Sequence, residues 1–168
     1  MSHQQIRDSN VILRTSDNAN IPEDANNRDW QEYQTWLADG NEPLPPEPIS
    51  LDIRRSDALA KVLAKRDEEL TKVVISNNKP FFADKDSMSL LNQTLSSQER
   101  GIAGIFPANW LLADGTVLSA TYEDLKAVNE LMAQRTAQNY GNYFSLVQQI
   151  ITAENPENVY IDYGWSEV

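Results

Sequence analysis

Few of the residues that commonly perform chemistry occur in this 168-residue sequence. Cysteine is absent, so a thiolate site lacks its central residue. The only histidine, His3, lies near the N-terminus, where we expect no scaffold to hold its imidazole in a catalytic site. We expect His3 to be exposed near the N-terminus. The carboxylate pairs Glu68–Glu69 and Glu123–Asp124 fall on a predicted exposed helix face and at a helix start, where solvation and capping account for them.

Loop motifs for metals and phosphates are incomplete. Asp84, Asp86 and Ser87 begin like a calcium-binding loop, but the glycine and the bidentate glutamate of such a loop do not follow at the required spacing. The six glycines are scattered, which does not favour a phosphate-binding loop. We therefore expect no cofactor, no metal site and no enzymatic activity.

Aromatic side chains near both ends of the chain are the better candidates for binding. One group lies on a single face of a short predicted helix at 28–39, and the other lies in 159–165, where the alternation is typical of a terminal strand. Aromatic residues are favoured anchors at interfaces. Each group could instead pack on its own domain, and the sequence leaves both options open. The candidate partner-binding residues are Trp30, Tyr33, Trp36, Leu37, Tyr160, Tyr163 and Trp165.

The elements that position the first group are short. Residues 6–14 read as a single strand without a matching neighbour, which predicts pairing with a hairpin elsewhere or with another chain. Asn26 or Asn27 can cap the helix at 28–39, and Gly40 ends it. Four prolines in 42–49 predict an extended, semi-rigid spacer.

The middle of the chain predicts two helices separated by a hairpin. Ser50 caps a helix that runs to about residue 72, and its polar side mixes charges as a solvated face does. A hairpin at 73–83 turns at Asn77 and Asn78, which tolerate positive φ. Asp84 or Asp86 then caps a helix that ends near Gly101.

A second hairpin and a long helix follow. The hairpin at 110–118 turns at Asp114–Gly115, and Thr121 with Asp124 forms a capping box for a helix at 121–153. An unbroken helix there would be about 50 Å long at roughly 1.5 Å per residue, and Gly141 makes a kink or break the alternative. Polar residues at 134–139 interrupt its apolar stripe, which needs a partner from this chain or from another copy.

These elements predict an α+β fold that is mostly helical. A long C-terminal helix packs with one or two shorter helices and two short β-hairpins, and a small N-terminal strand-helix element is separate. The predicted parts are a docking element at 1–41, a proline-rich linker at 42–49, a helical domain at 50–153 and an aromatic tail at 154–168.

The charge pattern excludes some ligands. The formal net charge is −11, with acidic ends and a balanced middle, whereas a nucleic-acid-binding face needs clustered Lys and Arg.

The first residues are polar and no apolar run is long enough to span a bilayer, so neither a signal peptide nor a membrane contact is expected. We expect a soluble protein made in the cytoplasm.

The order and spacing of these elements are similar to those of a known family. A long helix, a Val-x-x-x-Asn-x-x-x-Phe hairpin, an Asp-capped helix, a Trp-x-x-Ala-Asp-Gly-Thr-Val-Leu hairpin and a long helix together resemble the DUF4376 domain, a family of uncharacterised activity found in phage tail genes. The front of the chain resembles a segment common at the start of tail-fibre and tail-assembly proteins. The residues that carry these resemblances are Val74, Asn78, Phe82, Asp84–Asp86, Trp110, Ala113–Leu118 and, at the front, Ile21–Pro22, Asn27, Asp29–Trp30, Tyr33, Trp36–Ala38, Gly40–Asn41 and Pro43.

The resemblance implies an association with virion tails and supplies no catalytic residues. With the aromatic ends, it predicts a non-enzymatic structural or adaptor protein that binds fibre, baseplate or tail-tip subunits and is assembled into the tail in the host cytoplasm. The alternatives are a tail-fibre assembly chaperone and a host-directed inhibitor whose acidic ends meet a basic host protein. The long helix further predicts self-association, as a trimer.

Overall fold

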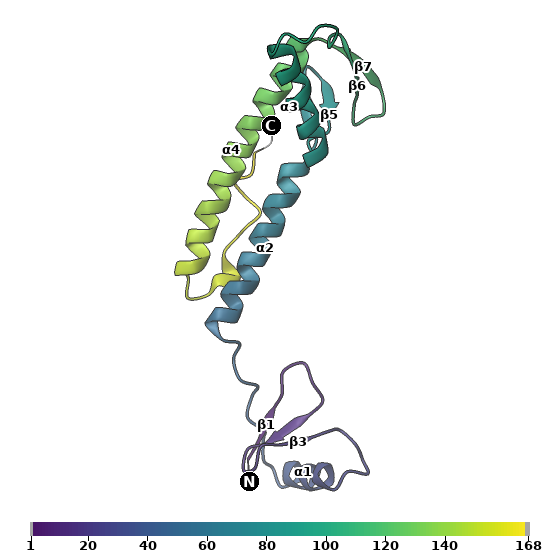
Figure 1. Cartoon of the computed structure of the whole chain (residues 1–168). Coiled ribbons are helices and arrows are strands. Elements are labelled where there is room, and N and C mark those ends of the chain that lie inside the picture. The colour runs from purple at the N-terminus through teal and green to yellow at the C-terminus, as the bar shows by residue number, and fades with distance from the viewer. Residues whose placement is uncertain (1, 167–168) are drawn as a thin grey trace. The chain divides into compact units, whose positions relative to one another are not determined.

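The chain folds as two compact units, divided between Ser50 and Leu51. The computed structural model describes residues 2–166 (Figure 1). The mixed α+β class predicted from the sequence is confirmed, with small antiparallel sheets and a long C-terminal helix.

The N-terminal unit contains a three-stranded antiparallel sheet in the order β1-β2-β3, formed by His3–Gln5, Ile12–Arg14 and Ala19–Ile21. The prediction of one unpaired strand at 6–14 is therefore wrong. Asp8 and Asn18 adopt positive φ and turn the chain twice, so that β2 finds both neighbours within the first residues.

Helix α1 (Arg28–Ala38) packs across this sheet. The side chain of Asn27 accepts hydrogen bonds from the backbone N–H groups of Asp29 and Trp30, which caps the helix as predicted. Tyr33 then lies in a small core with Ile12 and Ile21, and the other large side chains of α1 pack around it.

The proline-rich segment lies along the outer edge of β1. The backbone N–H of Leu44 donates to the oxygen of His3 at 2.8 Å, and the N–H of Gln5 donates to the oxygen of Leu44 at 2.9 Å. Arg7 also donates to the backbone oxygen of Glu47. This edge of the sheet is therefore paired within the unit.

The body of the C-terminal unit is an antiparallel pair of long helices, α2 (Leu51–Thr71) and α4 (Tyr122–Thr152) (Figure 1). Helix α4 is continuous through Gly141, so the alternative of a break at this glycine is wrong. Its buried stripe is also continuous through 134–139, because Arg135 and Asn139 are buried in it. Conversely, the aromatic residues Tyr140 and Phe144 of the same helix are exposed.

The far end of the pair carries both predicted hairpins and helix α3 (Lys85–Glu99). The first hairpin joins β4 (Val74–Ser76) to β5 (Lys79–Phe81) through two asparagines with positive φ, and the second joins β6 (Ala108–Leu111) to β7 (Val117–Ala120). The N–H of Ala113 donates to the oxygen of Pro80 at 2.8 Å and ties the hairpins together. The buried core here comprises Val74, Phe81, Ala83, Leu91, Leu95, Trp110, Leu112, Ala120, Leu125, Val128 and Met132.

Candidate partner-binding sites

The aromatic face predicted on α1 is present, and the side chain of His3 packs against it. His3 is buried, not exposed: its ring lies 5.0 Å from Tyr33 and 4.6 Å from Trp36 between ring centroids. Trp30 lies 5.3 Å from Tyr33. Burial, followed by the nearby charge of Arg14, lowers the pKa of His3 below its ordinary value. This ring cluster makes His3 a packing residue of the unit.

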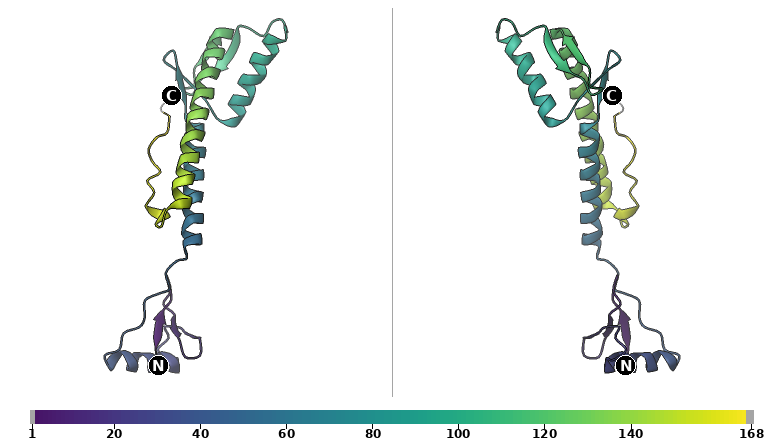
Figure 2. Two further views of the ribbon diagram at one scale, coloured as in Figure 1. Left: turned by 90° about the vertical axis from the view of Figure 1, so that its left-hand side faces the viewer. Right: turned by 90° about the vertical axis from the view of Figure 1, so that its right-hand side faces the viewer.

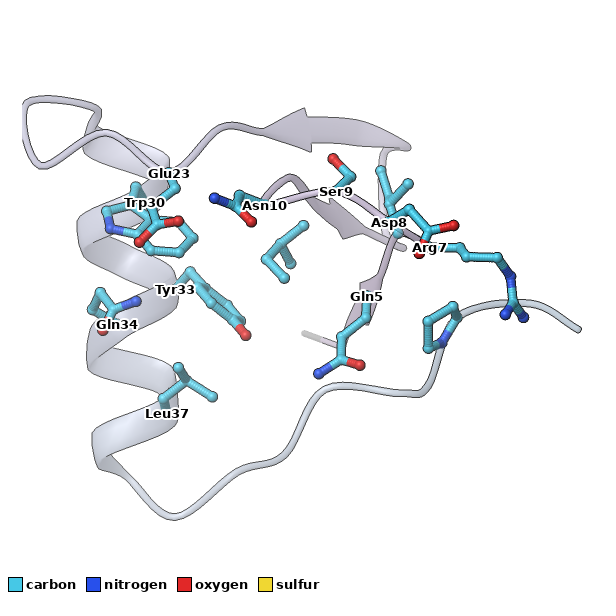
Figure 3. Close-up of a pocket in the computed structure, with 13 residues that line it drawn as sticks. Gln5, Arg7, Asp8, Ser9, Asn10, Glu23, Trp30, Tyr33, Gln34 and Leu37 are labelled. Atoms are coloured by element: carbon cyan, nitrogen blue, oxygen red, sulfur yellow. The ribbon is translucent and has the colours of Figure 1, made fainter.

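A pocket of about 640 Å³ opens beside this cluster (Figure 3). Trp30, Tyr33 and Leu37 line it from α1, whereas Trp36 does not line it. Tyr33 and Gln5 extend from α1 and β1 toward the space between the two elements (Figure 3). Burial raises the pKa of Tyr33, so its hydroxyl stays protonated and can donate a hydrogen bond.

Most of the other residues that line the pocket are polar, and the sequence did not predict their place in it. Gln5, Asn10, Glu23 and Gln34 line it. Amide side chains both donate and accept hydrogen bonds, and the aromatic rings add apolar contact area. The pocket can therefore accept a protruding polar or aromatic side chain of another protein. No sequence periodicity links these residues, because turns of the backbone bring them together from separate segments of the chain.

Arg14 holds α1 in place over the sheet. Its guanidinium donates to Asp17 at 2.8 Å and to Asp29 at 2.9 Å, which links β2, the following turn and the first turn of α1. The hydrogen bonds to Asp17 and Asp29 raise the pKa of Arg14, and the bond from Arg14 lowers the pKa of Asp17. The pocket wall is thereby held by ion pairs as well as by packing.

The second predicted group lies in 153–166, which is not a strand. A short 3-10 helix, η1 (Pro156–Asn158), is followed by irregular backbone that runs along one side of the α2·α4 pair (Figure 2). The alternation of aromatic and polar residues wrongly predicted a strand, because side chains and not a neighbouring strand form hydrogen bonds with this backbone. Asn142 donates to the oxygen of Tyr163, and Asn139 accepts from the N–H of Ser166.

The three aromatic residues of this segment have different environments. The Trp165 indole N–H donates to the oxygen of Ile161 at 2.7 Å, and its ring packs on the core formed by Leu146 and Ile150. Tyr160 and Tyr163 stack with their ring centroids 5.6 Å apart and remain exposed. Trp165 thus anchors the segment, and the stacked tyrosines present an aromatic surface to solvent.

A buried polar cluster lies under this segment and was missed by the sequence analysis. Glu69, predicted on an exposed face, is buried and pairs with Lys65 at 3.0 Å and with Lys72. Burial acts to raise the pKa of Glu69, but its bonds to Lys72 and Lys65 hold the pKa below the ordinary value. Burial lowers the pKa of Arg135, an effect that Glu69 opposes.

The described residues give no indication of a metal centre or a membrane span. Within 2–166, no group of His, Asp and Glu side chains is arranged to hold a metal ion. No helix in that range combines the length and apolar content that crossing a bilayer requires.

The protein is of the α+β class, and its candidate sites are surfaces lined by aromatic and polar side chains. Residues 53–164, more than half of the chain, match the family described as Domain of unknown function (DUF4376), and the chain belongs to this family. The predicted family is thus confirmed, while the tail association stays a prediction. Neither the curated proteins nor the solved structures gave a match.

Proposed function

We propose that this protein is a non-enzymatic structural adaptor of a phage tail that binds fibre, baseplate or tail-tip subunits. The observation that carries the proposal is the pocket at Trp30, Tyr33 and Leu37. It combines an aromatic wall with polar side chains, in a unit that is compact by itself. The resemblance of the front segment to tail proteins supports the kind of partner.

The stacked Tyr160 and Tyr163 supply a second contact surface on the other unit. Their two rings are pre-stacked, so binding a partner would cost little side-chain entropy. An adaptor needs two binding surfaces, and these two lie in different units. The adaptor would join two tail subunits, one at each surface.

The location in the virion can be tested on purified tails. If the chain is an adaptor, mass spectrometry of mature particles should find it in a fixed ratio to a tail subunit. Its absence from mature tails would contradict the structural role. If the absent chain nevertheless restored the solubility of a co-expressed fibre protein, it would be an assembly chaperone instead. Recovery of a host protein alone from host lysate would instead favour the inhibitor.

The binding role of the pocket can be tested with one matched pair of variants. Trp30→Ala removes the aromatic wall and should weaken capture of the tail subunit by about tenfold or more, as truncation of an aromatic anchor does. Thr35→Ala, at an exposed position of the same helix outside the pocket, should bind normally. Equal capture by both variants would exclude the pocket as the binding site.

A further inference from the structure

Helix α4 carries two apolar stripes between residues 133 and 151, and only one of them is fully buried. The buried stripe faces α2 and the C-terminal segment through Leu146 and Ile150. The other recurs at alternating spacings of four and three, which is the pattern of a coiled-coil seam. It consists of Ala133, Ala137, Tyr140, Phe144, Val147 and Ile151.

Most of this second stripe faces solvent, whereas Val147 is half-buried against the core formed by Leu146 and Ile150. Phe144 is 60% exposed, Ile151 40% and Tyr140 37%. Leu63 on α2 is also 40% exposed, three residues before Arg66 on the same face of that helix. The Arg66 guanidinium lies 5.3 Å from the ring centre of Tyr140, which brings this side of α2 against the stripe. The exposed apolar face therefore spans both helices.

The side of the pair that carries this face is distinct from the side covered by the C-terminal segment. That segment bonds to Asn139 and Asn142 on α4 and pairs with Arg54 on α2. At 100° per residue, Asn139 lies within the buried stripe, and Asn142 lies on the other side of that stripe from Tyr140 and Phe144. The C-terminal segment thus leaves the second stripe open.

The charge distribution indicates what can cover it. Residues 136–153 contain no charged side chain, although the chain carries a net charge of −11. Exposed aromatic residues without charges are typical of the centre of an interface and atypical of a solvated helix. Two copies of so acidic a chain repel each other over most of their surfaces. The part of the face that α4 contributes is uncharged, so two copies can meet there without that cost, with the α2 charges such as Arg66 at its edge.

We propose that this face pairs with the same face of a second copy about a two-fold axis, so that two α2·α4 pairs form a four-helix bundle. The stripe is about 27 Å long at 1.5 Å per residue, and a face formed by two helices side by side is about 20 Å wide. The projected area of the face is therefore on the order of 550 Å². The accessible area of a ridged helical face is larger and approaches the roughly 800 Å² per partner of a standard interface. One partner copy covers the whole of a flat face formed by two helices, so no part of the face is left for a third copy. The expected assembly is therefore a dimer and not the trimer that the sequence predicted.

The inference is independent of the tail role and is tested by the mass of the pure protein. Sedimentation equilibrium at micromolar concentrations should give a dimer for the unmodified chain. Phe144→Glu places a carboxylate at the centre of the face in each copy and should raise the dimer Kd by about tenfold or more. Gln138→Glu adds the same charge at an exposed position of α4 away from the stripe and should leave the Kd unchanged.

Circular dichroism melts of both variants verify the fold, and Ile151→Glu repeats the test at a second exposed position of the stripe. A monomeric mass for the unmodified chain would overturn the proposal and leave the face to a different protein. A trimeric mass would overturn the two-fold pairing. Dimers of both stripe variants with unchanged Kd would place the interface elsewhere.

Discussion

The guanidinium of Arg135 on α4 donates a 3.0 Å hydrogen bond to the backbone oxygen of Leu70 in the last turn of α2. It also donates to the oxygen of Lys72 just beyond that helix. The last carbonyls of a helix lack intrahelical partners and form the negative end of its dipole. A buried cation there satisfies them and fixes the point where α2 gives way to the β4–β5 hairpin.

Arg135→Ala should therefore strongly destabilise the C-terminal unit. It leaves buried carbonyls without donors and removes a cation near the buried Glu69, so the free energy of unfolding in urea should fall by roughly 3 kcal/mol. Lys126→Ala, at an exposed position of the same helix, should change it by less than about 0.5 kcal/mol. Similar losses from the two variants would show that Arg135 does not hold the end of α2.

Acid should destabilise the N-terminal unit through His3. Because burial lowers the pKa of His3 in the folded chain below its ordinary 6.5, the unfolded chain takes up the proton first as the pH falls. The stability that neutral His3 provides is therefore present above pH 6.5 and is lost as the pH falls toward the folded pKa. His3→Phe should remove this part of the pH dependence.

NMR can follow the His3 titration directly, since the sequence contains one histidine. The imidazole should titrate below pH 6.5 in the native chain and near 6.5 in denaturant. A native midpoint at or above 6.5 would show that the ring is not held in its buried position against Tyr33 and Trp36.

The parts of the fold that could be predicted from the sequence are those with local chemical signals. The Asn77–Asn78 and Asp114–Gly115 turns and the caps at Asn27, Asp84 and Thr121 all lie where their residue types predicted. Strands β1–β3 have three residues each, too few for a period-two pattern to be visible. This is why 6–14 was interpreted as one strand.

The candidate sites could be predicted less well, because periodicity is usually counted on apolar residues alone. Arg135 and Asn139 continue the buried stripe of α4 at the right spacing, but their polarity made them look like an interruption. On α1, the aromatic face was identified correctly, whereas the polar wall of its pocket depends on turns between short strands. The partner-binding role of the seven aromatic and apolar residues stays a prediction.

Thr121 should contribute a measurable share of the stability of α4. Its hydroxyl accepts from the N–H of Asp124, and the Asp124 carboxylate accepts from the N–H of Thr121. Thr121→Ala breaks this reciprocal pair and should lower the free energy of unfolding in urea by about 1 kcal/mol, and Thr121→Ser should recover most of it. An alanine variant as stable as the original chain would mean that the hairpin alone fixes the start of α4.

Gly141→Ala should stabilise the protein, although it changes a glycine in the middle of its longest helix. A Cβ at this position would meet no atom within 4 Å, and its backbone is helical. The free energy of unfolding in urea should therefore rise by roughly 0.5–1 kcal/mol. The same substitution at Gly115, where φ is +82°, should lower it, because alanine is strained in that conformation. A rise in stability at Gly141 together with a loss at Gly115 would support a helix that is continuous and open at Gly141. A loss of stability at Gly141 would mean that α4 bends there or that another surface packs closely against it.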